Sequence, residues 1–119
     1  MNIKKKRGIN CQLIFNQPPK TLWKVISAPN HLELFHPFCK ENIAISWDGM
    51  PYIDELEYLN GLKYVRKFVK WDPLKGYSLN IGKKQGKQSH VIWEIKEIDH
   101  ANCTLSITVY PHLLSNWPN

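Results

Sequence analysis

Turn-forming residues divide the chain from residue 41 onward into segments of the length that β-strands have. The dipeptides at 48–49, 60–61 and 72–73 and the stretches 82–86 and 99–102 contain the Gly, Asn, Asp and Pro residues that reverse a chain. The segments between them are 43–47, 53–59, 62–71, 77–82, 89–98 and 103–111. Because strands joined by short turns pair with their neighbours, this part of the chain is predicted to form an antiparallel meander.

One further strand and two short helices are predicted before this meander. Residues 8–16 alternate between two faces, as strand residues do. The proline pair at 18–19 favours the start of a first helix, and Pro29 ends it. Asn30 is a candidate cap for a second helix, with Glu33 three positions later as in a capping box. This order predicts an α+β fold in which two short helices follow the first strand of an antiparallel sheet.

The length of the chain favours one domain. With 119 residues and 43% apolar composition, the chain can build one hydrophobic core and is too short for two ordinary domains. We therefore predict a single domain over residues 1–119 with a basic N-terminal tail over residues 1–7. Beyond the tail, the positive charges are scattered apart from a looser group at 83–87, so the net charge of +6 does not predict a nucleic-acid partner.

Cysteine usage and hydropathy suggest a cytoplasmic protein. Cys11, Cys39 and Cys103 are odd in number and lack CxxC spacing, which favours buried reduced thiols over a disulfide framework. No apolar stretch approaches the roughly 18 residues of a membrane span, so integral membrane association is not expected. His36 and Cys39 lie three residues apart, but Pro37 breaks the helix that would align them. We therefore expect no metal site and no cofactor.

The Asn60-Gly61 pair makes a specific prediction about one hairpin. This dipeptide favours a two-residue type I′ turn, because both central positions of that turn need positive φ. Counting outward from such a turn places Glu55 opposite Arg66. The same register pairs further opposite charges across the two strands, which supports it. On the face of Glu55 and Arg66, it also places Glu57 opposite Tyr64.

The segments LWKVISAPNHLELFHPFCKEN, EYLNGLKYVRKF and LSITVYPH, taken with the order of elements, resemble the START and polyketide-cyclase-like superfamily (SRPBCC). They look like uncharacterised polyketide-cyclase-like members. The resemblance implies a helix-grip fold, in which a curved sheet surrounds an elongated hydrophobic cavity. Members use this cavity for lipid transfer, hormone binding or the cyclisation of polyketides. The family also has a long C-terminal gripping helix, whereas this chain ends at Asn119 directly after the last predicted strand.

The aromatic residues and the expected cavity predict a binding protein for a hydrophobic, lipid- or polyketide-like small molecule. The candidate ligand-binding residues are Trp23, Phe35, Phe38, Glu57, Tyr58, Tyr64, Arg66, Phe68, Trp93 and His112. Arg66 and Tyr64 are the candidates for orienting a carbonyl, carboxylate or hydroxyl group of the ligand. No serine or cysteine has a neighbour that marks an activated nucleophile, so no catalytic residue is assigned.

Two alternatives stay open. A cyclase or dehydratase would use Arg66, Tyr64, Glu57 or His112 to polarise or deprotonate a bound polyketide-like substrate. An assembly module would use the sheet face that the gripping helix covers in the family, since a large uncovered apolar face is a liability for a monomer. On this last ground we also expect a homodimer.

Overall fold

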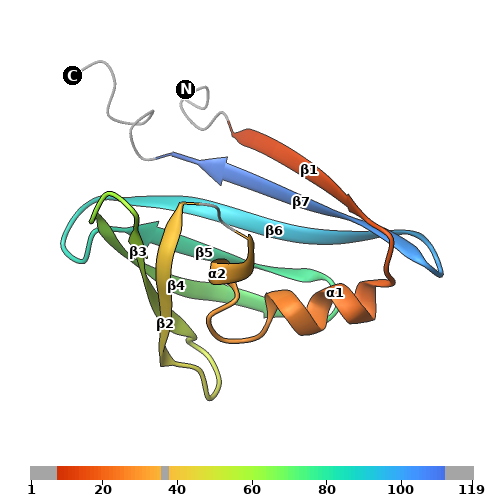
Figure 1. Ribbon diagram of the computed structural model, residues 1–119, viewed down its shortest axis with the longest axis horizontal. Helices are drawn as coiled ribbons and strands as arrows, with labels where there is room; N and C mark the ends of the chain where they lie inside the picture. The colour runs from red at the N-terminus through yellow and green to blue at the C-terminus, as the bar shows by residue number, and fades with distance from the viewer. Residues whose placement is uncertain (1–7, 36–37, 112–119) are drawn as a thin grey trace.

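The computed structural model describes residues 8–35 and 38–111, which form a seven-stranded antiparallel sheet and two helices (Figure 1). The strands are β1 (Ile9–Phe15), β2 (Cys39–Ser46), β3 (Ile53–Tyr58), β4 (Lys63–Asp72), β5 (Gly76–Gly82), β6 (Gln88–Asp99) and β7 (Asn102–Tyr110). The helices are α1 (Pro19–Ile26) and α2 (Leu32–Phe35), both between β1 and β2. The spatial order of the strands in the sheet is β1-β7-β6-β5-β4-β3-β2. All neighbouring strands except β1 and β7 therefore also follow one another in the sequence. The predicted fold class and element order are confirmed.

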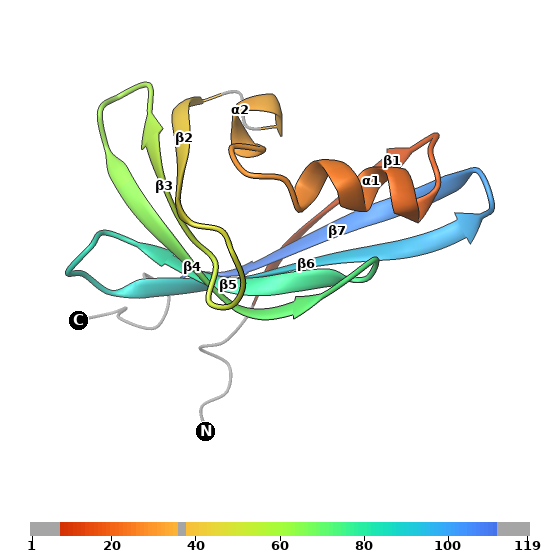
Figure 2. The same cartoon turned by 90° about the horizontal axis from the view of Figure 1, so that it is seen from below.

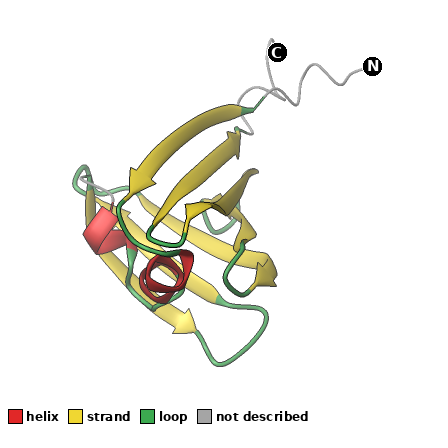
Figure 3. Cartoon of the chain, turned by 90° about the vertical axis from the view of Figure 1, so that its right-hand side faces the viewer, coloured by secondary structure: helices red, strands yellow, loops and turns green. Residues whose placement is uncertain are grey.

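The sheet is strongly curved, and both helices lie on its concave side (Figure 2). Figure 3 views α1 nearly end-on and shows the strands curving around it. Pro18 is extended and precedes helix α1, and Pro19 occupies the first turn. Proline suits this position because its ring presets φ and because an N–H in the first turn would have no partner within the helix. Its buried side chains, Leu22 and Ile26, are four residues apart and therefore share one face. That face packs on the concave side of the sheet.

The hydrophobic core lies between α1 and the central strands. Its buried members are Leu22, Ile26, Leu32, Leu56, Phe68, Tyr77, Leu79, Val91, Trp93, Ile95, Cys103 and Leu105. Beside it stands an aromatic cluster in which Trp71 stacks on Tyr77 with ring centroids 5.2 Å apart, while Trp23 meets Trp71 edge-on at 5.3 Å. These bulky rings fill the end of the concave side that α1 covers.

The hairpin between β3 and β4 differs from the predicted one by a single residue. The Gly61 N–H donates to the Tyr58 carbonyl at 2.9 Å and the Tyr58 N–H donates to the Leu62 carbonyl at 2.8 Å, which leaves three residues in the loop. Gly61 has φ +91, as the residue after a type I turn requires in such loops. The two-residue turn and the register that we derived from it are therefore wrong.

The observed register pairs Asp54, rather than Glu55, with Arg66. A shift of one residue moves every side chain of a strand to the opposite face. Consequently Asp54 and Leu56 are buried on the concave side, while Glu55 and Glu57 belong to the convex face. The β4 residues Tyr64, Arg66 and Phe68 keep the common face that the sequence predicted.

Helix α2 is held by β2 instead of by the predicted capping box. Asn30 has φ +65, a conformation that asparagine tolerates better than most residues, and its side-chain oxygen accepts from the Ala44 N–H at 3.2 Å. The cap is Asn42, whose Oδ1 accepts from the Leu32 N–H at 3.0 Å. Glu33 accepts in turn from the Asn42 N–H at 2.8 Å. These bonds place α2 beside the middle of β2.

The three cysteines are free thiols in different environments. Cys103 is buried in β7 as predicted, whereas Cys11 is exposed, because β1 is an edge strand with little packed over it. None of the helices in residues 8–35 and 38–111 is long and apolar enough to cross a membrane. Among the same residues, no group of three or more His, Cys, Asp or Glu side chains is arranged to hold a metal ion.

Candidate functional site

The concave side of the sheet encloses a hollow of about 530 Å³. Side chains from β1, α2 and strands β3 to β7 line it, together with Phe38 just before β2. The apolar lining residues are Leu13, Leu32, Phe38, Leu56, Leu79, Ile81, Val91, Trp93, Ile107 and Val109, and the polar ones are Tyr58, Tyr64, Arg66 and Ser89. Successive lining residues of one strand are two positions apart because strand side chains alternate between faces. The wall is thus mostly apolar and includes one charged side chain, Arg66.

Arg66 forms a buried ion pair with Asp54 on the neighbouring strand. Its Nε donates to Asp54 Oδ1 at 2.9 Å and its Nη2 donates to Oδ2 at 2.6 Å. Both residues are at most 2% exposed. The Arg66 guanidinium also lies 4.9 Å from the centre of the Phe68 ring, so an aromatic ring faces the planar cation. Two-point pairing of this kind fixes the orientation of the guanidinium as well as its charge.

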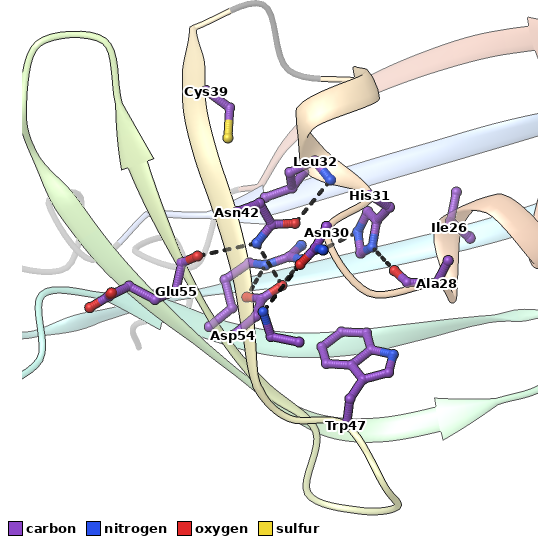
Figure 4. A network of polar contacts seen from close by, with 12 residues as sticks. Ile26, Ala28, Asn30, His31, Leu32, Cys39, Asn42, Trp47, Asp54 and Glu55 are labelled. Carbon is purple, nitrogen blue, oxygen red and sulfur yellow. Dashed lines mark hydrogen bonds and ion pairs between the residues drawn. The ribbon is translucent and has the colours of Figure 1, made fainter.

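Asn42 links this ion pair to helix α2 (Figure 4). Its Nδ2 donates to Asp54 Oδ2 at 3.0 Å and to the Glu55 carbonyl at 3.2 Å, while its Oδ1 caps α2 through Leu32. The Asn42 side chain is buried, with 1% of the residue exposed. Asp54 therefore accepts on both carboxylate oxygens from the protein itself.

His31 lies on the other side of the Arg66 guanidinium. Its Nδ1 is 2.8 Å from the Ala28 carbonyl, which can only accept, so Nδ1 carries the proton (Figure 4). Its Nε2 lies 3.2 Å from Arg66 Nη2 and is the acceptor of that contact. Burial, together with the positive charge of Arg66, lowers the pKa of His31 to about 4. His31 is therefore neutral at neutral pH.

Tyr77 completes the buried network. Its hydroxyl donates to the Ile26 carbonyl at 2.9 Å and lies 3.1 Å from His31 Nε2. Burial raises the pKa of Tyr77 well above its usual range, so the hydroxyl stays protonated. The network ties α1, the loop that follows it, β3, β4 and β5 together, and it is assembled around one cation and one anion.

The Arg66 side chain is also a hydrogen-bond partner of Tyr77. Its Nε and Nη2 atoms make the contacts with Asp54 and His31. Arg66 is also one of the residues that line the hollow.

Of the candidate ligand-binding residues, the structure brings five together around the hollow. These are Phe38, Tyr58, Tyr64, Arg66 and Trp93. Phe38 is at the mouth, where 64% of it is exposed next to Leu59 and Leu62. A second depression of about 430 Å³ is lined by these three residues together with Tyr58, Asn60 and Tyr64. It shares Phe38, Tyr58 and Tyr64 with the hollow.

The other candidates lie elsewhere. Trp23 and Phe68 belong to the aromatic cluster and core beside the hollow. Glu57 is on the convex face with its carboxylate 3.9 Å from Lys40, so the expectation that it faces the cavity is wrong, and the cause is the register shift of β3. The side chain of Phe35 and all of His112 lie outside the described residues.

The sequence interpretation missed His31, Asn42 and Asp54. Alternation along β3 offered a signal for Asp54, because Leu56 and Tyr58 stand two and four positions after it. Nothing in the pattern marks His31, which follows Asn30 in a loop between two short helices. It is placed by packing of α1 and α2 against the sheet.

Comparison with known proteins identifies the fold. No family model and no curated protein matches the sequence. The Zhui aromatase/cyclase from Streptomyces sp. R1128 superposes with a TM-score of 0.72 at 13% identity, over 87% of this chain and 66% of that one. The di-domain aromatase/cyclase BexL of the BE-7585A biosynthetic pathway gives 0.71 at 8% identity, over 87% of this chain and 35% of that one.

A START superfamily protein from Mycobacterium smegmatis gives a TM-score of 0.66 at 12% identity, over 86% of this chain and 74% of that one. The chain thus spans about a third of BexL and about two thirds of the Zhui protein. At these identities the similarity establishes the fold alone. The chain has the START and polyketide-cyclase-like fold that its sequence resembles.

Proposed function

We propose that this protein binds a hydrophobic small molecule, lipid- or polyketide-like, in the hollow on the concave side of its sheet. The observation that carries the proposal is an apolar hollow of about 530 Å³ with a single charged side chain, Arg66, among its lining residues. Ligand sites are typically concave, mostly apolar and about 300–1,000 Å³ in volume, with few polar groups that set orientation. The hollow has each of these properties.

The energetic case rests on the lining. Burial of apolar surface contributes roughly 25 cal/mol per Å² to the free energy of binding. Ten of the fourteen lining residues are apolar, and the indole N–H of Trp93 is the one polar group on their side chains. Tyr58, Tyr64 and Ser89 add hydroxyl groups to the wall. Solved proteins of the same fold that are described as aromatase/cyclases and as START proteins agree with a site for a hydrophobic molecule.

The test is saturable binding of the neutral fluorescent probe N-phenyl-naphthylamine, with a variant that fills the hollow. Ile81→Trp adds a bulky side chain to the lining and is expected to weaken binding at least about tenfold. The matched control is Ile14→Trp on β1, because Ile14 is 74% exposed and is not among the lining residues. Absence of saturable binding to the folded wild type, or equal binding by both variants, would exclude the hollow as the site.

A cyclase or dehydratase is the second candidate function, favoured by the aromatase/cyclases among the similar structures and by Arg66 and Tyr64 in the lining. In such an enzyme Arg66 would polarise a carbonyl group of the substrate, and a tyrosine hydroxyl would donate a proton to the substrate or accept one from it. Asp54 and His31 are already bonded to Arg66 and are not lining residues, so they do not supply a base. Mass spectrometry of a linear poly-β-ketoacyl thioester incubated with the protein distinguishes this enzyme from a carrier. An enzyme removes water from the thioester, whereas a carrier leaves its mass unchanged.

Exposed apolar residues favour a third role in assembly. Leu34, Phe38 and Leu59 are 77%, 64% and 64% exposed, and a second copy of the chain could cover them. The expected assembly is a homodimer at tens of micromolar protein in light scattering. A monomer under these conditions contradicts the assembly role and leaves the binding proposal intact.

A further inference from the structure

We propose that two copies of this chain associate edge to edge through β1, so that their sheets join into one across a two-fold axis. The proposal goes beyond the binding function, and it uses a surface apart from Leu34, Phe38 and Leu59. Those three residues lie in α2, just before β2 and just after β3, toward the other edge of the sheet. The proposal rests on a difference between the two edge strands, β1 and β2 (Figure 1).

Strand β2 is poorly suited to pairing with a further strand. The Asn42 N–H donates to Glu33 Oε2 at 2.8 Å, and the Ala44 N–H donates to the side-chain oxygen of Asn30 at 3.2 Å. The register of β2 against β3 shifts at two places. The second and third residues of the strand are a lysine and a glutamate. Charged side chains, bulges and covering segments are the devices by which natural sheets prevent edge-to-edge pairing.

Strand β1 differs from β2 in charge and regularity. Residues 9–15 contain no charged residue and no proline, and all seven pair with β7 without a register shift. Residues 9–14 are exposed, among them Ile9 at 60% and Ile14 at 74%. A regular, uncharged and partly apolar edge of this kind is a template for another strand, because main-chain hydrogen bonds then supply the affinity.

The added strand is β1 of a second copy, because β1 is complementary to itself. A two-fold axis perpendicular to the sheet pairs the two strands antiparallel and keeps both concave faces on one side. A pairing centred on Gln12 uses all seven residues, and it sets Gln12 opposite Gln12, Cys11 opposite Leu13 and Ile9 opposite Phe15. The facing side chains are then apolar on the concave side, and the two Gln12 amides meet on the convex side, where each can donate to the other. Leu13 lines the hollow, so Cys11 of the second copy continues its concave wall.

Charge favours the antiparallel arrangement. Residues 4–7 are all basic and come just before β1 in the sequence. In an antiparallel pair the two strands begin at opposite ends of the shared edge, so the points where the two basic segments join their strands are far apart. A parallel pair would bring these points together and would add a repulsion between like charges.

A charge exchange at Gln12 tests the two-fold pairing. Gln12→Lys and Gln12→Glu each set like charges opposite one another, and each is expected to weaken self-association about fivefold in sedimentation equilibrium. An equimolar mixture of the two variants sets opposite charges at the same point. The mixture is expected to form mixed dimers at least as tight as the wild-type dimer, and native mass spectrometry identifies them. The matched controls are Ile45→Lys and Ile45→Glu on β2, because Ile45 is 60% exposed on the other edge strand, and they should leave association unchanged.

Cross-linking of the wild type supplies a test that does not depend on the folding of a variant. The register sets the two Cys11 residues two positions out of line on neighbouring strands, which corresponds to about 8 Å between their Cα atoms. A bismaleimide of similar reach is expected to join two copies, and Cys11→Ser is expected to abolish the product. Near-ultraviolet circular dichroism shows whether the Gln12 variants keep their tertiary structure.

The outcomes separate this interface from the other proposals. A monomeric wild type at tens of micromolar, association that neither Gln12 variant weakens, or a mixture that does not recover it would overturn pairing through β1. Loss of the dimer in Phe38→Lys but not in Gln12→Lys would assign the interface to Leu34, Phe38 and Leu59 instead. Binding of N-phenyl-naphthylamine is measured independently of association, so a failure of this interface is distinguishable from a failure of the binding function.

Discussion

Arg66 donates to both carboxylate oxygens of Asp54, at 2.9 and 2.6 Å, although the two residues are 2% and 0% exposed. Buried ions are costly to desolvate, and their attraction offsets that cost only when the remaining hydrogen-bonding groups have partners. Asn42 supplies a further donor to Asp54, and His31 supplies an acceptor to Arg66. The pair thus fixes a cation beside an apolar hollow and orients it at the same time.

Removal of one partner of this pair is expected to be strongly destabilising. Asp54→Ala leaves the Arg66 charge buried without its counter-ion, and we expect a loss of about 3–5 kcal/mol in the free energy of unfolding, measured by urea denaturation. Glu57→Ala is the control, because Glu57 is 3.9 Å from Lys40 on the outer face, and exposed pairs contribute about 0–1 kcal/mol. Similar losses in the two variants would contradict a buried pair.

His31 makes stability depend on pH in a defined window. Its pKa is about 4 in the folded protein and about 6.5 in the unfolded chain, so the unfolded state binds the proton first as pH falls. The contribution of neutral His31 to the free energy of unfolding is fully present above pH ~6.5 and is lost as the pH falls from ~6.5 to ~4. The total loss is on the order of 3 kcal/mol. His31→Gln should reduce the slope of unfolding free energy against pH in this window. An unchanged slope would place His31 in contact with solvent.

Two glycines with positive φ should differ in their tolerance of a methyl group. At Gly61, with φ +91, an added Cβ meets nothing within 4 Å, so Gly61→Ala should lose only the backbone term of about 1 kcal/mol. At Gly76, with φ +139, the Cβ would collide with the backbone of Trp93 on β6. Gly76→Ala should therefore lower the thermal midpoint considerably more. Equal effects would contradict the close approach of β5 and β6 at this point.

Trp93 should report on ligand binding. It lines the hollow, whereas Trp23, Trp47 and Trp71 do not. Addition of N-phenyl-naphthylamine is expected to quench part of the intrinsic fluorescence, and Trp93→Phe should remove most of that change. Trp23→Phe should keep it, since Trp23 lies in the aromatic cluster against Trp71. If quenching follows Trp23 instead, the probe is bound near α1 and not in the hollow.

The cysteines should react with a thiol reagent at different rates. Cys11 is exposed on the edge strand and should react first, while Cys103 is buried and should react only on unfolding. Burial also raises the pKa of the Cys103 thiol, which further lowers its thiolate fraction. Cys11→Ser should abolish the fastest phase. Rapid labelling of Cys103 in the native protein would contradict the packing of β7.

Local chemistry in the sequence was sufficient to predict the order of elements. Prolines at 18–19 start α1, and clusters of Gly, Asn and Asp separate the strands of the meander. Alternation within β4 also placed Tyr64, Arg66 and Phe68 on one face, because this face follows from the two-residue period alone. These features depend on neighbouring residues, which the sequence shows directly.

The partner of Arg66 depended on the loop between β3 and β4. A two-residue and a three-residue loop both suit Leu59-Asn60-Gly61, and both registers bring opposite charges together, with Glu55 or with Asp54 opposite Arg66. The choice between them falls to burial, because only the observed register turns Leu56 inward along with Asp54. The local turn and charge preferences do not distinguish the two registers, and burial of Leu56 in the core selects the observed one.

The sequence by itself therefore determined the α+β class, the strand order along the chain and the inner face of β4. Only the tertiary structure decided that Asp54 neutralises Arg66, that His31 accepts from it and that a hollow remains beside them. Strand and turn signals act over a few residues, whereas this network joins side chains 12 and 35 positions apart in the chain. Such contacts form only when α1, α2 and the curved sheet exclude water from the same space, which no local pattern encodes.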